Sequence, residues 1–215
     1  MTMHATRIIA IRHGETAWNV DTRLQGQLDI GLNATGRQQA RRVALALSRE
    51  PIDAIYASDL LRAWDTASAI ADATGGDLQA VTALRERNFG MLQGQTHAEI
   101  EANWPAEARH WRQRDPLWTP EGGESLMDLR ERIIRATSEL AARHVGGQIV
   151  LVAHGGVMDA LYRAATRQEV QAPRTWNLGN AAINRLLWTP DGLTLVGWSD
   201  TRHLEDDAIL DETST

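Results

Sequence analysis

The sequence predicts an α/β fold, built as a three-layer sandwich around a mainly parallel central sheet. Short β-branched runs alternate along the chain with stretches in which apolar residues recur every three or four positions. The first pattern is typical of buried strands, and the second is typical of helices that cover a sheet. Strands that alternate with helices favour right-handed crossovers and parallel sheets, so this alternation predicts the fold class.

The first half of the chain is expected to run strand, helix, strand, helix, strand. The first strand is the apolar run 8–11, which is short, β-branched and bounded by charged residues. After a polar loop, Thr35 is expected to cap a helix that ends near Arg49. The other elements expected here are a strand at 52–58, a helix capped by Asp59 that runs through 73, and a strand at 78–84.

The second half begins with the clearest helix, 124–144, whose apolar residues form one face. Charged pairs four residues apart, such as Asp128 with Arg132, are expected to form its solvated face. Residues 1–203 are expected to form a single domain, followed by an acidic, mobile tail at 204–215. The other elements expected here are a strand at 148–153, a helix at 157–166, and a hairpin of strands at 182–188 and 193–198 joined by a turn at 189–192.

The middle segment, residues 85–123, differs in composition from both halves. It holds Trp104, Trp111 and Trp118 together with three prolines. We interpret this segment as an insertion that covers the active site at one end of the sheet. Its tryptophans either form a contact surface or pack onto the core, because indole rings serve both purposes. Two short helices are expected within it, at 96–103 and 105–113.

The composition is that of a globular protein, with 43% hydrophobic and 23% charged residues among 215. The formal net charge of -6 argues against a nucleic-acid partner, although a local basic pocket remains compatible with it. The chain has no cysteine, so disulfides, thiolate nucleophiles and cysteine metal sites are excluded. Met1–Ala5 lacks the features of a signal peptide, and no apolar run approaches membrane-spanning length. A cytoplasmic location without a membrane partner is therefore expected.

Two histidines stand in the same setting, each directly after an apolar strand and before a glycine. His13 belongs to the motif Arg-His-Gly-Glu-Thr at 12–16, and His154 opens the motif His-Gly-Gly at 154–156. Open α/β sheets bind their ligands at the carboxyl ends of strands. If the two strands are parallel neighbours, the histidines face each other across one crevice.

Two arginines and one carboxylate are expected at the same edge of the sheet. Arg12 precedes the first histidine, Arg62 follows the second strand, and Glu86 follows the third. Arginine forks neutralise phosphoryl oxygens, a neutral histidine can attack phosphorus, and an acid can protonate the leaving oxygen. The set therefore predicts phosphoryl transfer.

Two other interpretations of these residues are disfavoured by their neighbours. Two histidines and one acid could bind zinc, but the adjacent arginines would repel a cation. Ser58 and Ser125 lack the flanking glycines of a serine nucleophile at a strand-to-helix turn. Neither a metal site nor a serine nucleophile is expected.

From about residue 7 to residue 165 the chain resembles the histidine phosphatase superfamily, which includes the 2,3-bisphosphoglycerate-dependent phosphoglycerate mutases. The resemblance implies a phosphoglycerate mutase-like α/β fold with a mainly parallel sheet. The motifs that carry it are Arg-His-Gly-Glu-Thr at 12–16 with Trp18 and Asn19, Arg-Leu-Gln-Gly at 23–26, Ser-Asp-Leu at 58–60 with Arg62-Ala63 and Thr66-Ala67, Leu-Arg-Glu at 84–86 with Phe89-Gly90 and Gln93-Gly94, Gly-Glu-Ser at 123–125, and His-Gly-Gly at 154–156.

The resemblance also implies a role for each matching residue. His13 is the residue that becomes phosphorylated, and Glu86 is the proton donor. Family phosphatases need neither a metal nor an organic cofactor, so none is expected. The phosphoryl group is held by Arg12, Arg62 and His154, and the further substrate or phosphate contacts implied are Asn19, Arg23, Gln25, Gly26 and Gly155.

The family contains both phosphatases and mutases. Glu86–Gly94 resembles mutases, but Phe89 stands where mutases usually carry tyrosine, and Gly156 stands where they carry asparagine. The adjacent arginine pair of mutases is absent. Arg112 and Arg114 are the nearest candidates, with Arg109, and a solvated helix face explains Arg112 and Arg114 equally well. We therefore favour a phosphatase acting on a small phosphorylated metabolite. A mutase is the alternative, and a non-catalytic phosphate-binding protein is a third. The oligomeric state is left open.

Overall fold

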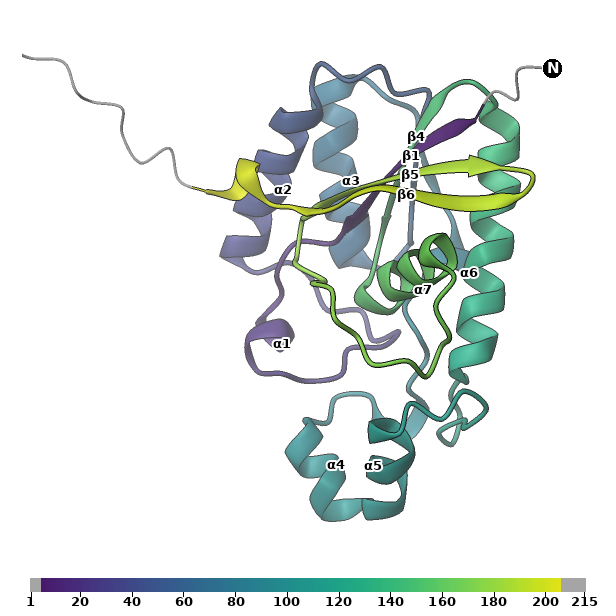
Figure 1. Cartoon of the computed structure of the whole chain (residues 1–215). Helices are drawn as coiled ribbons and strands as arrows, with labels where there is room; N and C mark the ends of the chain where they lie inside the picture. Colours follow the sequence, from purple (N-terminus) through teal and green to yellow (C-terminus); the bar gives the residue numbers. More distant parts are fainter. Residues whose placement is uncertain (1–4, 206–215) are drawn as a thin grey trace, which may run out of the picture.

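The computed structural model of the protein, which describes residues 5–205, is organised around one central sheet. Its strands are β1 (Thr6–Arg12), β2 (Ala54–Ala57), β3 (Leu78–Ala80), β4 (Gln148–Ala153), β5 (Ile183–Thr189) and β6 (Gly192–Asp200). They lie in the order β3-β2-β4-β1-β5-β6 (Figure 1). β1 to β4 are parallel, whereas β5 and β6 are antiparallel additions beside β1. The mainly parallel sheet is confirmed.

Two pairs of helices cover the two faces of this sheet. α2 (Ala34–Leu47) and α3 (Leu61–Thr74) pack on one face, and α6 (Leu126–Ala141) and α7 (Gly155–Thr166) pack on the other (Figure 1). Buried side chains of β1 alternate between the layers: Ile9 and Ile11 pack with the first pair, and Ile8 and Ala10 with the second. A strand buried on both faces needs apolar residues at every position, so the run is continuous. The three-layer sandwich is confirmed.

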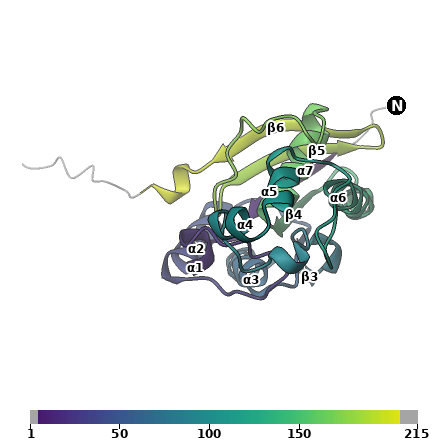
Figure 2. The same cartoon turned by 90° about the horizontal axis from the view of Figure 1, so that it is seen from below.

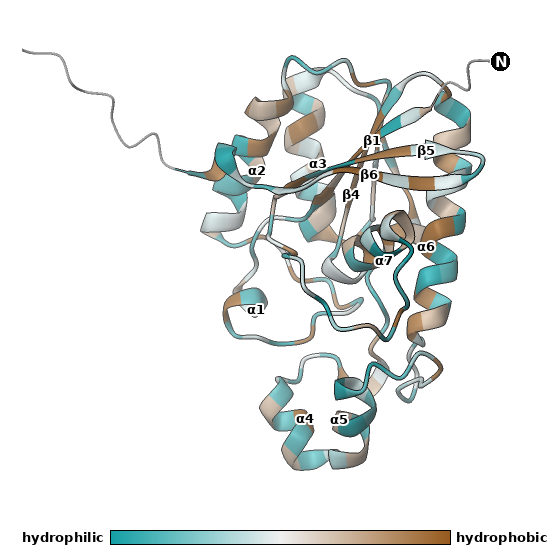
Figure 3. Cartoon of the chain, viewed as in Figure 1, coloured by the Kyte–Doolittle hydropathy of each residue, from teal (hydrophilic) through white to brown (hydrophobic). Residues whose placement is uncertain are grey.

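Shorter elements complete the chain. α4 (His97–Asn103) and α5 (Pro105–Arg112) lie beyond the carboxyl ends of the central strands (Figure 1) and therefore in front of the sheet when it is seen from below (Figure 2). Most of their residues are hydrophilic (Figure 3). Trp104, Trp111 and Trp118 pack with Leu92 and Ile100 in a separate small core. No helix within residues 5–205 has the length and apolar character needed to cross a bilayer. The shorter elements are α1 (Ala17–Val20), η1 (Thr82–Leu84), η2 (Gly90–Leu92), α4 (His97–Asn103), α5 (Pro105–Arg112), η3 (Ala142–His144) and η4 (Arg202–Leu204).

Two helix starts differ from the prediction. Asn33, not Thr35, caps α2, and its side chain accepts a hydrogen bond from the Gly36 N–H. Asn33 lies at the position where a cap can reach the first free N–H groups of the helix. Leu60, not Asp59, precedes α3 and offers no side-chain cap. The Asp59 carboxylate instead pairs with Arg85, at 2.5 and 2.7 Å.

The charged face of α6 is not uniformly solvated, which corrects the prediction. The Arg132 guanidinium donates two hydrogen bonds to the Glu124 carboxylate, each at 2.8 Å. It also donates to the carbonyls of Ala83 and Arg85. The predicted partner, Asp128, instead caps the helix through Ser125. Arg132 therefore fixes the segment that leads into Glu86.

The third strand and the end of the chain also differ from the prediction. β3 ends at Ala80, because residues 82–84 form η1 rather than continuing the strand. The hairpin of β5 and β6 is confirmed at the edge of the sheet, with Gly192 at a φ of +123° in its turn. Of the tail predicted at 204–215, residues 206–215 lie outside the described residues.

Candidate active site

The two histidines lie side by side, because β1 and β4 are parallel neighbours in register. The His13 N–H continues the ladder by donating to the Ala153 carbonyl at 2.9 Å. The two imidazole centroids are 5.2 Å apart, and the residues are only 2% and 0% exposed. The prediction that His13 and His154 face each other at this edge of the sheet is therefore confirmed.

The hydrogen bonding of His13 selects one form of its ring. Nδ1 lies 2.7 Å from the Gly14 carbonyl oxygen. A carbonyl only accepts, so Nδ1 carries the proton and Nε2 keeps a free lone pair. Burial lowers the pKa of His13 well below its usual value, and the charges of Arg12 and Arg62 lower it further. His13 is therefore neutral at pH 7, as a nucleophile must be.

Gly14 lets the chain turn tightly after His13. An added Cβ would lie 2.5 Å from the Gly36 carbonyl oxygen, so only glycine fits. The Gly14 N–H donates to Thr66 Oγ1 at 3.0 Å, and that hydroxyl donates to the Arg62 carbonyl at 2.8 Å. The motif at the end of β1 is thus tied to the first turn of α3.

Arg62 lies in the first turn of α3 and is fully buried. Its Nη1 donates to the Leu28 carbonyl at 2.8 Å, and its Nη2 donates to the Gly26 carbonyl at 2.7 Å. Burial lowers the pKa of Arg62 to about 10, which leaves it charged at pH 7. Gly26 holds a positive φ of +53°, and an added Cβ there would meet the Gln93 side chain. The structure thus places Gly26 as a support for Arg62.

Several buried nitrogens around His13 have no partner within the described residues. They are Nε of Arg12, Nε of Arg62, and both ring nitrogens of His154. Burial lowers the pKa of His154 well below its usual value, and Arg62 adds to this effect. Buried polar atoms are normally satisfied, so a converging set of unsatisfied nitrogens indicates a place for an anion.

Glu86 is bound to the start of α7. The Gly156 N–H donates to both carboxylate oxygens, at 2.9 and 3.1 Å, and the Arg87 N–H donates to Oε1 at 2.8 Å. A Cβ on Gly155 would lie 3.6 Å from Arg12 Cζ and 3.8 Å from Glu86 Oε2. The proposed acid and the first arginine therefore flank the same glycine.

Asn19 caps α1 together with Thr16. Its Oδ1 accepts from the Thr16 N–H at 3.0 Å and from the Asn180 Nδ2 at 3.4 Å. These donors fix the orientation of the amide, and its Nδ2 group makes no hydrogen bond within residues 5–205. Asn19 is therefore oriented as a donor, in keeping with its predicted contact to phosphate.

Two other predicted contacts are placed differently. Arg23 donates to the Gly94 carbonyl at 2.8 Å and pairs with Glu99 at 2.9 Å, so its guanidinium ties the loop after α1 to α4. Gln25 is buried, and its Oε1 has no partner within the described residues. A phosphate contact by either residue stays a prediction.

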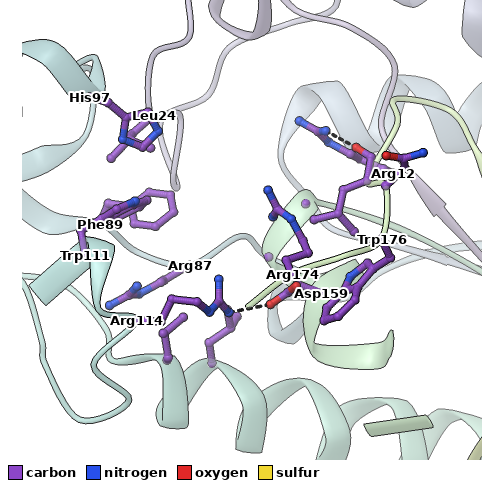
Figure 4. A pocket seen from close by; sticks show the side chains of 16 residues that line it. Arg12, Leu24, Arg87, Phe89, His97, Trp111, Arg114, Asp159, Arg174 and Trp176 are labelled. Atoms are coloured by element: carbon purple, nitrogen blue, oxygen red, sulfur yellow. Dashed lines mark hydrogen bonds and ion pairs between the residues drawn. The ribbon is translucent and has the colours of Figure 1, made fainter. Parts of the chain in front are cut away.

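A cavity of about 530 Å³ opens beside Arg12, Gly155 and Gly156 (Figure 4). The segment 85–123 supplies one wall, which includes Phe89 and Trp111. This size fits a small-molecule site. Within residues 5–205, no three histidine, aspartate or glutamate side chains converge as metal ligands would. The lining is Arg12, Leu24, Arg87, Phe89, His97, Trp111, Arg114, Leu126, Leu129, Gly155, Gly156, Asp159, Arg174, Trp176, Asn177 and Leu178.

Arg114 and Arg112 have different surroundings. Arg114 lines the cavity, pairs with Asp159 at 2.8 Å, and donates to the Val170 carbonyl at 3.0 Å (Figure 4). Arg112 is exposed and pairs with Glu101 on the surface of the insertion. Arg109, the third candidate, is exposed and does not line the cavity, so only Arg114 of the three reaches it.

Sequence reasoning missed four residues here. Arg87 is buried, with its guanidinium over the rings of Phe89, Trp111 and Trp118. It directly follows Glu86 in the sequence, so adjacency could have flagged it. Asp159 is a charged residue among apolar positions of α7, which is also a readable signal. The other two, Arg174 and Asn180, lie in a loop without periodicity, and no pattern points to them.

Known proteins share this architecture. The profile of the histidine phosphatase superfamily (branch 1) matches residues 8–201. Phosphoglycerate mutase-like protein 4 of Arabidopsis thaliana is 40% identical over 208 residues, which cover 94% of this chain and 89% of the relative. The metal-independent phosphoserine phosphatase of the same plant is 37% identical over 209 residues, which cover 95% and 86%. A structure of mycobacterial glucosyl-3-phosphoglycerate phosphatase with VO3 has a TM-score of 0.82 at 38% identity, covering 91% of this chain and 99% of that one. The chain therefore belongs to branch 1 of the histidine phosphatase superfamily.

Proposed function

We propose that the protein is a phosphatase that hydrolyses a phosphomonoester through a phosphohistidine at His13. The observation that carries this proposal is the set of buried, unpartnered nitrogens of Arg12, Arg62 and His154 around a neutral His13. An incoming phosphoryl group accepts hydrogen bonds from the Nε–H groups of Arg12 and Arg62 and from the one protonated ring nitrogen of neutral His154, and its oxygens bring the charge that the arginines neutralise.

The reaction has two balanced steps. In the first, His13 Nε2 attacks phosphorus, the ester P–O bond breaks, and protonated Glu86 gives its proton to the leaving oxygen. In the second, the Glu86 carboxylate takes a proton from water as the water oxygen attacks phosphorus. The P–N bond then breaks, which releases phosphate and restores neutral His13 and protonated Glu86. Arg12, Arg62 and His154 hold the phosphoryl oxygens in both steps.

Two features favour a phosphatase over a mutase. Gly156 stands where mutases carry asparagine, and a Cβ there would lie 2.2 Å from the Glu86 Oε1, so a side chain at this position would displace the Glu86 carboxyl group. The mutase-like arginine pair is reduced to one residue in the cavity, Arg114, which is already paired with Asp159.

We further propose that the substrate is a small metabolite whose leaving group carries a second negative charge. Arg87, Arg114 and Arg174 line the cavity beyond Arg12, and Asp159 is the single carboxylate among the lining residues. Arg174 is exposed and forms no ion pair within the described residues. Phosphoserine and glucosyl-3-phosphoglycerate, which appear in the relatives' names, both carry a carboxylate.

The test is a set of matched esters assayed with EDTA present. We expect hydrolysis of p-nitrophenyl phosphate, and a higher kcat/KM for 3-phosphoglycerate than for glycerol 3-phosphate, which lacks the carboxylate. The Arg174→Ala variant is expected to reduce that preference. Absence of phosphate release from every ester would contradict the phosphatase. Conversion of 3-phosphoglycerate that depends on 2,3-bisphosphoglycerate would instead support the mutase alternative.

A further inference from the structure

The loop between α7 and β5 holds the main chain at the end of β1. The Ala181 N–H donates to the Arg12 carbonyl at 2.8 Å. In return, Nη1 of Arg12 donates to the Leu178 carbonyl. Both the backbone and the guanidinium of Arg12 are therefore fixed by residues 178–181.

Asn180, in the same loop, contacts the next residue of the motif. Its Nδ2 donates to the His13 carbonyl at 2.9 Å and to the Asn19 Oδ1 at 3.4 Å. Because a backbone carbonyl only accepts, the atom of Asn180 that faces His13 must be the NH2 group. The atom of Asn19 that faces this NH2 group must then be its oxygen. The same assignment follows independently from the Thr16 N–H, which donates to that oxygen at 3.0 Å.

The backbone that carries Asn180 is strained and held from two sides. Ala181 has a φ of +54°, in the left-handed region that alanine rarely adopts. Its N–H is bound by Arg12, and its carbonyl lies 3.0 Å from the His203 Nε2. Strained residues persist where their surroundings over-determine them, and they cluster at functional sites. Asn180 therefore projects from a backbone that is fixed in the free protein.

We propose that Asn180 is a positioning residue, which holds the His13 carbonyl and the Asn19 amide so that Nε2 of His13 and Nδ2 of Asn19 serve the same phosphoryl group. Within residues 5–205, Asn180 is the donor to the His13 carbonyl. That carbonyl belongs to the peptide joining His13 to Gly14, and the Gly14 carbonyl in turn orients the imidazole. The proposal rests on the proposed function, because it concerns how the same site is held.

A double-mutant cycle separates positioning from a general structural role. The variants are Asn180→Ala, Asn19→Ala and the double variant, with Asn180→Asp as a second change that keeps the size of the side chain and removes its donor. Asn103→Asp is the matched control, since Asn103 is an exposed asparagine at the end of α4. The readouts are the rate constant of phosphoenzyme formation from p-nitrophenyl phosphate in rapid mixing, the Kd for orthovanadate, and the melting temperature.

Asn180→Ala is expected to slow phosphoenzyme formation about tenfold, as one lost hydrogen bond would. Because Asn180 acts partly by holding the Asn19 amide, adding Asn180→Ala to the Asn19→Ala variant should lower the rate constant of phosphoenzyme formation by only about threefold or less. Asn180→Asp should slow phosphoenzyme formation more than Asn180→Ala does, because a carboxylate repels the His13 carbonyl oxygen and the Asn19 Oδ1 that it would face. Asn103→Asp should match the wild type.

Two outcomes would overturn the proposal. One is a wild-type rate of phosphoenzyme formation in Asn180→Ala. The other is a double variant whose rate is lowered by the full product of the factors seen in Asn19→Ala and Asn180→Ala, which would show that the two residues act independently. If the wild-type protein forms no phosphoenzyme from any ester, the proposed function fails, whereas the cycle can still be measured with the vanadate Kd. Weaker vanadate binding in Asn180→Ala that is not additive with Asn19→Ala would support positioning, and additive or unchanged binding would contradict it.

Discussion

The N–H of Gly156 donates to both carboxylate oxygens of Glu86, at 2.9 and 3.1 Å. Gly156 lies in the first turn of α7, which begins directly after His154. The first turn of a helix carries free N–H groups that attract negative charge. One helix start therefore places both the second histidine and the proposed acid.

Gly156→Ala tests this relationship, because an added Cβ would lie 2.2 Å from the Glu86 Oε1 and must displace the carboxyl group. We expect kcat for an alkyl phosphate to fall about a hundredfold, the scale of losing a placed general acid. Gly155→Ala is the comparison, since its Cβ would make ordinary contacts of 3.6 Å or more. The kcat of Gly155→Ala for the alkyl phosphate should fall clearly less than that of Gly156→Ala. Equal falls in kcat in the two variants would contradict the placement of Glu86 by the Gly156 N–H.

Glu86→Gln tests the role of the carboxyl group as acid. An alkoxide leaves poorly unless it is protonated, whereas p-nitrophenolate needs little protonation. Compared with the wild type, the variant should therefore form phosphoenzyme very slowly from an alkyl phosphate, whereas its rate with p-nitrophenyl phosphate should fall much less. Pre-steady-state mixing with both esters measures this. Equal losses with both esters would show that Glu86 is not the acid.

The pH dependence tests the state of His13. Its neutral form attacks, and its lowered pKa keeps it neutral below pH 6.5, where a free histidine gains a proton. Phosphoenzyme formation from p-nitrophenyl phosphate should therefore stay level from about pH 7.5 to about pH 5.5. A fall centred near pH 6.5 would show that His13 has an ordinary pKa and is not buried as described.

The core of this site could be predicted because its residues come directly after regular elements. His13 and His154 stand at the ends of apolar runs, and parallel neighbours bring such ends together. Arg62 was found because it begins a helix after a strand. A residue at the end of a strand can be placed from the sequence, since the strand itself fixes its position and direction.

The supports of the site could not be predicted in the same way. Spacing along α6 offered Asp128 as the partner of Arg132, but the actual partners are Glu124 and carbonyls of another segment. Asn180 and Arg174 lie in a loop, where no periodicity tells which side chain turns inward. Their contacts depend on tertiary packing, which local pattern does not encode.

Arg132→Ala is expected to destabilise the protein and to disturb Glu86. The change removes the guanidinium that donates to the Glu124 carboxylate and to the carbonyls of Ala83 and Arg85, and leaves the Glu124 carboxylate, whose side chain is 15% exposed, with only the Asn88 N–H at 3.3 Å within residues 5–205. The pair is partly buried, so breaking it should cost about 2 kcal/mol, less than the loss of a fully buried pair. The exposed Arg135 on the same helix supplies the control Arg135→Ala, which should change stability by less than about 0.5 kcal/mol. Urea unfolding of both variants measures the difference, and equal stabilities would refute this role of Arg132.

The central claim is the covalent intermediate at His13, and trapping it is the most direct measurement. Wild-type protein mixed with a phosphomonoester, quenched at alkaline pH and digested, should give one phosphorylated peptide with the modification on His13. His13→Ala should give no phosphopeptide and no measurable hydrolysis while melting at a temperature close to that of the wild type. Phosphate found on another residue, or turnover by folded His13→Ala, would contradict the account.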